Sequence, residues 1–158
     1  MKKILSAILA CVVIITAFSG CGKLYHRVND FLTIRDYPFL HPREEIVHIE
    51  IGILRSCEAF PGVAVETLAV IPEEEWQTLL DRLCALTCRR GFGDPAYLYP
   101  DKEVIHIVYE NGDYESINDY AQVTYKNGHY SRESYSWFDS SEFQALIDQT
   151  LAEVEKNR

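Results

Sequence analysis

The stretch Glu103–Tyr114, which reads EVIHIVYENGDY, decides what fold the sequence predicts. Its first part, Glu103–Glu110, is apolar at both odd and even positions, a pattern typical of a strand covered on both faces. Asn111-Gly112 follows and is a strong hairpin signal, because a type I′ turn needs a positive φ at both central residues. We therefore expect a central strand that turns back into an antiparallel hairpin.

A second copy of this turn follows at Tyr125–Tyr130, which reads YKNGHY. In each copy two tyrosines flank the Asn-Gly dipeptide, so we expect their rings to face each other across the strands. Glu110 and Asp113 are expected to be solvated at the tip of the first turn. Together the two copies predict two type I′ hairpins in an antiparallel meander.

Two strands and a helix are expected before this region. Ile46–Leu54 alternates between apolar and polar residues, and Val63–Ile71 is a second run of β-prone residues. On the first of these strands, the residues expected on one apolar face are Val47, Ile49 and Ile51. Pro72 then begins a helix that we expect to end at Gly91, because proline suits the first turn of a helix and glycine suits its end.

A capped amphipathic helix is expected near the C-terminus. Asp139–Glu142 supplies polar capping residues, and apolar side chains then recur at helical spacing from Phe143 to Val154. The complete order of elements is β-β-α-β-β-β-β-α. This order predicts an α+β fold in which two helices pack on a twisted antiparallel sheet of about five to six strands.

The N-terminus has the anatomy of an export signal, in which a positive segment precedes an apolar one. Lys2 and Lys3 precede the uncharged run Ile4–Phe18, and small residues follow it. Phe18-Ser19-Gly20-Cys21 resembles the lipobox of bacterial lipoproteins, with phenylalanine where leucine is usual. This resemblance covers residues 1–21 only. It implies that the thiol of Cys21 receives a diacylglycerol and that cleavage leaves this acylated cysteine as the first residue.

The resemblance also suggests how the chain is divided. Residues 1–20 are expected to be the signal peptide, residues 21–45 the lipidated N-terminus and tether, and residues 46–158 a single globular domain. The second half of the tether is apolar and is expected to pack on that domain. Such a chain is held at the cell membrane by its acyl chains and faces the extracytoplasmic side. The alternatives are a retained membrane-spanning helix and ordinary secretion.

Composition restricts the classes of partner. The 158 residues carry a net charge of −9, which argues against nucleic acid and permits an envelope protein or another cationic partner. Nothing in the sequence resembles a nucleophile elbow, a P-loop, a dinucleotide fingerprint or a zincin helix. We therefore predict no catalytic residue, no cofactor and no metal.

The cysteines and histidines leave alternatives open. Cys84 and Cys88 are expected on one side of the same helix, too far apart along it to form a disulfide with each other. Cys57 is predicted either to bond with one of them or to remain, like them, a buried thiol. The third alternative is zinc binding by the three cysteines together with His48 or His106. His48 and His106 are expected to be core histidines with a hydrogen-bond partner rather than catalytic bases or metal ligands.

Aromatic residues are concentrated in the second half of the chain and form the predicted binding surface. These residues are Tyr109, Tyr114, Tyr125, Tyr130, Tyr135 and Trp137. Aromatic rings on a sheet face bind sugars, peptides or proteins, although they are also ordinary filling for a pleated sheet. The sequence thus favours a membrane-anchored, non-enzymatic binding module of the cell envelope. The alternatives are an inhibitor or immunity-type protein that blocks a surface enzyme, and a small enzyme whose site is not visible in the sequence.

Overall fold

The computed structural model describes most of the chain after the N-terminal segment, namely residues 33–34, 37–55, 64–89, 101–119, 122–133 and 138–157. The chain divides into two compact units, residues 1–33 and residues 34–158, and the second is the folded domain that contains the sheet and both helices. The predicted signal peptide and Cys21 lie outside the described residues.

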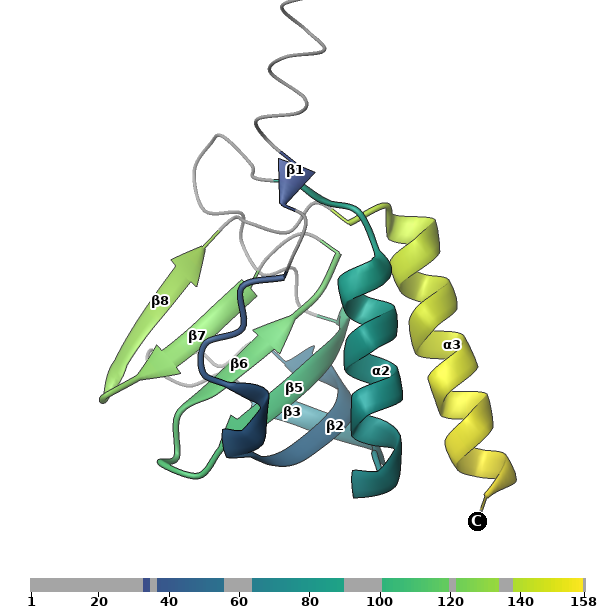
Figure 1. Cartoon of the computed structure of the whole chain (residues 1–158), viewed down its shortest axis with the longest axis horizontal. Coiled ribbons are helices and arrows are strands. Elements are labelled where there is room, and N and C mark those ends of the chain that lie inside the picture. The colour runs from purple at the N-terminus through teal and green to yellow at the C-terminus, as the bar shows by residue number, and fades with distance from the viewer. Residues whose placement is uncertain are drawn as a thin grey trace, which may run out of the picture. The chain divides into compact units, whose positions relative to one another are not determined.

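One six-stranded antiparallel sheet forms the body of this domain, with the strand order β3-β2-β5-β6-β7-β8 (Figure 1). The strands are β2 (Ile46–Arg55), β3 (Ala64–Val70), β5 (Glu103–Tyr109), β6 (Tyr114–Ile117), β7 (Gln122–Lys126) and β8 (His129–Glu133). A separate two-stranded sheet consists of β1 (Thr33–Ile34) and β4 (Cys88–Arg89). Strand β5 lies inside the sheet, between β2 and β6, as its apolar pattern predicted.

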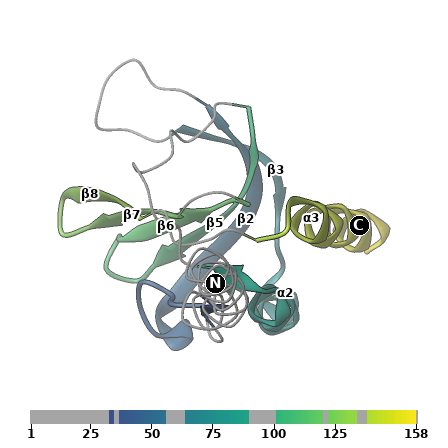
Figure 2. The same ribbon diagram turned by 90° about the horizontal axis from the view of Figure 1, so that it is seen from above.

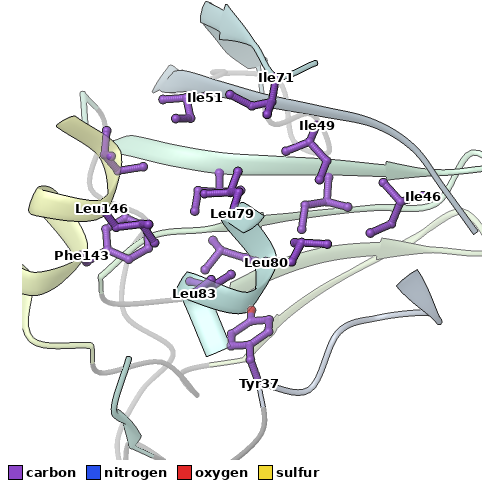
Figure 3. Close-up of a cluster of buried hydrophobic side chains, with 14 of the residues drawn as sticks. Tyr37, Ile46, Ile49, Ile51, Ile71, Leu79, Leu80, Leu83, Phe143 and Leu146 are labelled. Atoms are coloured by element: carbon purple, nitrogen blue, oxygen red, sulfur yellow. The ribbon is translucent and has the colours of Figure 1, made fainter. Parts of the chain in front are cut away.

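Two helices, α2 (Glu73–Ala85) and α3 (Ser140–Lys156), cover one face of the sheet at the β3-β2-β5 end (Figure 2). Their apolar side chains meet the isoleucines of β2 and β5 in the core (Figure 3), and the cluster includes Ile49, Ile51, Ile105, Ile107, Leu79, Leu80, Leu83, Phe143 and Ile147. The α+β class and the order β-β-α-β-β-β-β-α are those that the sequence predicted.

Helix α3 begins where the sequence predicted, and α2 ends earlier than predicted. Asp139 caps α3 by accepting hydrogen bonds from the backbone N–H groups of Ser141 (2.9 Å) and Glu142 (3.3 Å). Helix α2 ends at Ala85, because Leu86 is extended (φ −70°, ψ 145°). The prediction of a helix up to Gly91 is wrong.

Cys88 explains the early end of α2. It lies in β4, is only 2 % exposed and packs in the core. Tertiary pairing and burial outweigh the weak helix preference of the segment. Cys84 and Cys88 consequently do not share a helix face, contrary to the prediction.

Two bulges shape the β3-β2-β5 end of the sheet. Ile46 pairs with Tyr109 and His48 pairs with Val108, so Val47 is an extra residue in β2. Its side chain is 49 % exposed, so the prediction that it lies on the apolar face with Ile49 is wrong. An added residue of this kind interrupts the alternation of the strand.

The second bulge lies between β2 and β3 and depends on a glycine. Ile51 pairs with Ala69 and Gly52 with Thr67, which leaves Leu68 as the extra residue of β3. A Cβ atom at Gly52 would collide with the side chain of Val65 and lie 2.7 Å from the carbonyl oxygen of Glu66. Glycine is therefore needed here for the close approach of β3.

The N-terminal strap, residues 37–45, belongs to the same packed unit as the sheet. Tyr37 is 5 % exposed in the core, and Phe39 and Leu40 pack against the same cluster. The 3₁₀ turn η1 (Arg43–Glu45) ends the strap just before β2. These contacts confirm the prediction that the second half of the tether packs on the domain.

The two Asn-Gly turns have different geometries. At the second turn, Tyr125 pairs with Tyr130 and Lys126 with His129, which leaves Asn127-Gly128 as a two-residue loop. Both residues have positive φ, 51° and 82°, so the predicted type I′ turn is confirmed.

At the first turn the loop is one residue longer. Val108 pairs with Tyr114, and the N–H of Tyr109 donates to the carbonyl of Asp113 (2.9 Å). In the loop Glu110–Gly112, positive φ occurs only at Gly112 (83°), as in a type I turn that ends in a left-handed glycine. The predicted type I′ turn at Asn111-Gly112 is therefore wrong.

Candidate functional site

Three tyrosines from three neighbouring strands lie together on the sheet face opposite the helices. We call Tyr114, Tyr125 and Tyr130 the tyrosine face. Tyr114 and Tyr125 are stacked at 5.1 Å between ring centroids, and Tyr130 lies 4.9 Å from Tyr125. The hydroxyl of Tyr114 donates to that of Tyr130 at 2.7 Å. Each of the three side chains is half-buried, so the cluster is ordered by its own contacts while part of every residue stays accessible.

Strand register explains why these rings meet. Tyr114 pairs with Tyr125 across β6 and β7, and Tyr125 pairs with Tyr130 across β7 and β8. Residues directly opposite each other in an antiparallel pair point to the same face, and aromatic pairs at such positions stabilise a sheet. The cluster therefore follows from the local pairing of three strands.

His106 borders the tyrosine face. Its ring centroid is 5.0 Å from that of Tyr114, and its Nδ1 is 2.8 Å from the hydroxyl of Ser116. Burial lowers the pKa of His106, which favours the neutral ring. Ser116 is fully buried, so the Ser–His pair is a structural hydrogen bond. His106 therefore has a hydrogen-bond partner, as predicted, but it is half-buried at the border of the tyrosine face rather than in the core.

A second histidine lies nearby on β2. The Nε2 of His48 is 3.2 Å from a carboxylate oxygen of Glu50, and the hydroxyl of Thr67 donates to the same oxygen at 2.9 Å. His48 therefore also has a hydrogen-bond partner, as predicted. Its side chain is 38 % exposed, so it lies at the surface rather than in the core.

The other predicted members of the binding surface do not join this cluster in the described structure. Tyr109 lies on the helix-covered side of the sheet and is 1 % exposed. Tyr135 and Trp137 lie outside the described residues. The aromatic cluster in the described structure is thus smaller than the predicted one and consists of the tyrosine face alone.

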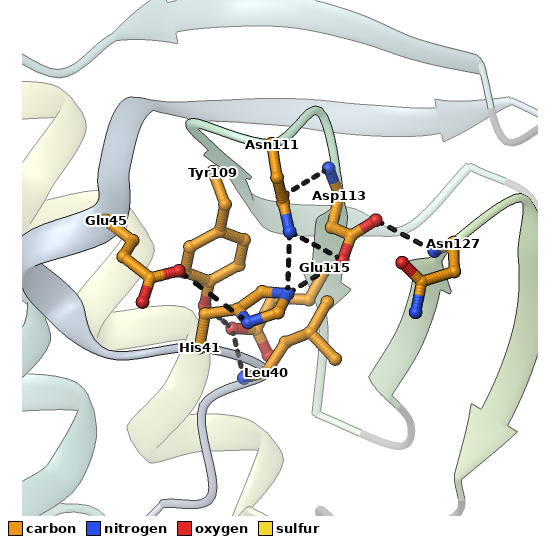
Figure 4. A network of polar contacts seen from close by, with 8 residues as sticks. All are labelled: Leu40, His41, Glu45, Tyr109, Asn111, Asp113, Glu115 and Asn127. Carbon is orange, nitrogen blue, oxygen red and sulfur yellow. Dashed lines mark hydrogen bonds and ion pairs between the residues drawn. The ribbon is translucent and has the colours of Figure 1, made fainter.

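A buried polar network lies on the opposite side of the sheet, beneath the N-terminal strap (Figure 4). Glu115, which is fully buried, accepts hydrogen bonds from the hydroxyl of Tyr109, from the amide of Gln122 and from the backbone N–H of Leu40 (3.1 Å). Burial raises the pKa of Glu115, while these hydrogen bonds oppose that rise. Burial and the neighbouring Glu115 also raise the pKa of Tyr109.

Asp113 connects this network to both turns. One carboxylate oxygen accepts from the backbone N–H of Asn127 (2.9 Å), and the other contacts His41 Nε2 (2.8 Å) and the side-chain amide of Asn111 (3.0 Å). The N–H of Asp113 also donates to the side-chain oxygen of Asn111 (2.9 Å). The pKa of Asp113 is lowered, first by the Asn127 N–H and then by His41 and Asn111.

Sequence reasoning missed this role of Asp113. We expected it to be solvated beside Glu110, whereas its side chain is only 4 % exposed. Its partners come from the strap, from its own turn and from the second turn, and their approach depends on the complete fold. The only local signal was that aspartate follows Asn-Gly in the first turn, where histidine follows it in the second.

The described cysteines are part of the packing around α2. The Sγ atom of Cys84 accepts a hydrogen bond from the guanidinium of Arg43 at 3.1 Å. Burial raises the pKa of Cys88 to about 11, which disfavours its thiolate. The predicted bond of Cys57 to one of them stays a prediction, because Cys57 lies outside the described residues. Within the described ranges no group of three His, Cys, Asp or Glu side chains is placed to hold a metal ion.

A small polar cleft separates α2 from α3. Its lining includes Arg82 and Glu153, which form a bidentate ion pair with N–O distances of 2.8 and 3.2 Å. The amide of Asn157 donates to Glu75 across the same cleft at 2.8 Å. These polar groups bind one another and thereby join the two helices.

No family model, curated protein or solved structure matches this chain. Among the helices in the described part of the chain, none is both long enough and apolar enough to span a bilayer.

Proposed function

We propose that this protein is a lipid-anchored binding module of the cell envelope and that its binding surface is the tyrosine face. One observation carries the proposal: three tyrosine rings from adjacent strands form an ordered cluster on the sheet face that the helices leave uncovered. Tyrosine offers a large contact area at a low entropic cost, and its hydroxyl tolerates water when no partner is bound. These properties suit a surface that is exposed between binding events.

The charge of the chain favours one kind of partner. A net charge of −9 repels nucleic acid and attracts cationic proteins, most strongly at low salt. We therefore propose a protein partner with a basic surface. If that basic surface surrounds the active site of an enzyme, this protein would act as an inhibitor or immunity-type protein.

Substitution of the outer two tyrosines tests the binding surface. Tyr125→Ala with Tyr130→Ala is expected to weaken capture of envelope proteins by the immobilised, acylated chain. Glu155→Ala is the matched control, because Glu155 is exposed on α3 in the helix layer. Circular dichroism should show that both variants are folded. Unchanged capture by the folded tyrosine variant would refute the proposed surface.

His106→Ala separates binding from the enzyme alternative. We expect this change to lower stability and to leave capture intact, because His106 is hydrogen-bonded to the buried Ser116. Loss of capture in folded His106→Ala, together with normal capture by the tyrosine variant, would favour a site built around the histidine.

The anchor is tested independently of the binding surface. We propose that Cys21 is the mature N-terminus and carries the lipid, on the strength of the Phe18-Ser19-Gly20-Cys21 motif. Mass spectrometry of the protein from its native membrane should find a lipid-modified peptide that begins at Cys21. A dominant unmodified peptide that spans Ser19 to Lys23 would contradict the proposal.

A further inference from the structure

We propose that Asn127 is a site of spontaneous modification, at which the side-chain amide converts to aspartate or isoaspartate, and that the fold protects Asn111 from the same reaction. Both residues precede glycine, and both are exposed in hairpin loops. The sequence alone would therefore make them equally reactive. The inference does not depend on the proposed binding function.

The reaction needs only the chain and water. The backbone nitrogen of the glycine loses its proton to hydroxide and attacks the side-chain carbonyl carbon of the preceding asparagine. A new C–N bond closes a five-membered succinimide, and the side-chain nitrogen leaves as ammonia. Water then adds to either carbonyl of the ring, which opens to aspartate or to isoaspartate. Glycine favours this sequence because no Cβ atom shields its nitrogen.

Both reacting groups of the first turn are engaged in hydrogen bonds. The N–H of Gly112, which would have to attack, donates to the carbonyl of Tyr109 at 2.9 Å. The side-chain oxygen of Asn111 accepts from the N–H of Asp113, and its amide nitrogen donates to the Asp113 carboxylate. Figure 4 shows this fixed amide between Asp113 and His41. Ring closure at Asn111 therefore requires several hydrogen bonds to break.

The corresponding groups of the second turn are not engaged in this way. Across the described residues, no hydrogen bond involves the side-chain amide of Asn127 or the N–H of Gly128. The bond that Asn127 does make comes from its backbone N–H, which donates to Asp113 at 2.9 Å, and no dashed line in Figure 4 ends on its side-chain amide.

The position of the second turn in the sheet also favours the reaction. Among the described strands, β8 is the last of the sheet and pairs with β7 alone. Outer hairpins open locally more often than central strands do, and such opening lets the chain leave the left-handed conformation of Asn127. Opening is necessary because the glycine nitrogen must swing toward the side-chain carbonyl.

The product would alter the tyrosine face. Isoaspartate places one additional carbon in the main chain. Because the turn has only two residues, this longer backbone would disturb the neighbouring pair Tyr125–Tyr130. Either product also places a new carboxylate beside Asp113. Modification at Asn127 would therefore loosen the outer hairpin as the protein ages.

The test compares the two asparagines within one molecule. The intact chain is incubated at mildly alkaline pH, native in one arm and unfolded in urea in the other, and peptide mass mapping follows succinimide, aspartate and isoaspartate at both positions. In the native arm we expect Asn127 to convert about tenfold faster or more than Asn111, since additional hydrogen bonds hold Asn111. In urea we expect similar rates. Equal native rates, faster conversion at Asn111, or no conversion at Asn127 while the urea arm reacts would each overturn the inference.

Discussion

The two Asn-Gly turns of this protein carry the same dipeptide and the same flanking tyrosines but differ in geometry and surroundings. The turn Tyr125–Tyr130 is a two-residue type I′ loop whose tyrosines pair across the strands. The turn Tyr109–Tyr114 has a three-residue loop, and its tyrosines lie on opposite faces of the sheet. The difference shows that the Asn-Gly dipeptide occurs in hairpins of both kinds and does not by itself fix the loop length.

One additional loop residue has a large effect because side chains alternate along a strand. A shift of one residue moves a side chain from one face of the sheet to the other. Tyr109 is therefore buried with Glu115 under the strap, whereas Tyr114 joins Tyr125 on the face opposite the helices. The first turn thus distributes its tyrosines between the core and the proposed binding surface.

The largest difference between the two turns is expected at the residue that follows glycine, which is Asp113 in the first turn and His129 in the second. Asp113→Ala would remove a carboxylate that is only 4 % exposed and that His41, Asn111 and Asn127 all contact. We expect a loss of roughly 2–4 kcal/mol in the free energy of unfolding, measured by urea denaturation. His129→Ala is the matched control, because His129 occupies the same position in the second turn and is exposed. Its cost should stay within about 0.5 kcal/mol. Equal costs for the two variants would mean that the Asp113 contacts do not distinguish the turns.

The pH dependence of stability should single out Asp113 in a second way. Hydrogen bonds lower its folded pKa below the unfolded value, so its contribution is complete above the unfolded pKa. That contribution is lost as the pH falls through the lowered, folded pKa. Denaturation between neutral and acidic pH should therefore show a smaller acid-induced loss in Asp113→Asn than in the parent chain. An identical slope in both proteins would contradict this assignment.

Glu115, two residues away, should behave in the opposite sense. Burial raises its folded pKa, so its stabilising contribution exists at low pH and is lost as the pH rises through that raised pKa. Glu115→Gln should therefore gain stability relative to the parent toward neutral pH. Measuring Asp113→Asn and Glu115→Gln over the same pH range therefore distinguishes the contribution of the turn carboxylate to stability from that of the buried carboxyl group.

Substitution of the turn glycines tests a feature that the two turns share, namely a glycine with positive φ. Gly112 and Gly128 have nearly the same φ, 83° and 82°, and an added Cβ would meet nothing within 4 Å at either position. The cost of Gly112→Val and Gly128→Val should thus come from backbone strain alone, roughly 1–3 kcal/mol for each. Chemical denaturation of both variants provides the measurement. A large cost at one glycine and none at the other would show that packing, not φ, limits these positions.

The sequence predicted the features of this fold that depend on local patterns. The strands, the two helices, the cap at Asp139 and the second turn follow from periodicity, turn residues and side-chain capping within a few residues. These signals are short-range and act before the chain is compact. Pro72 is the N-cap of α2, and the helix itself begins at Glu73. The predicted start of this helix at Pro72 is therefore correct to within one residue.

The errors concern features that distant parts of the chain decide. Helix α2 ends early because Cys88 is buried and paired in β4, and Val47 leaves its expected face because β2 bulges against β5. The role of Asp113 depends on His41 and Asn127, which lie far from it in sequence. The tyrosine face was predicted as a cluster, but its membership depended on the loop length of the first turn. No periodicity within the chain carries that information.

The smallest effect is expected at the asparagines, where the two turns should respond differently to glycine. Asn127 has a φ of 51°, which glycine adopts without strain, and its side chain makes no contact that holds the described turn. Asn127→Gly should therefore change the free energy of unfolding by at most about 0.5 kcal/mol. Asn111→Gly would lose the two hydrogen bonds between its side chain and Asp113, with an expected cost of about 1–2 kcal/mol in the same assay. If both substitutions were neutral, the Asn111 side chain would have no part in holding the longer loop, and the choice of loop length would rest on Asp113 and the strap alone.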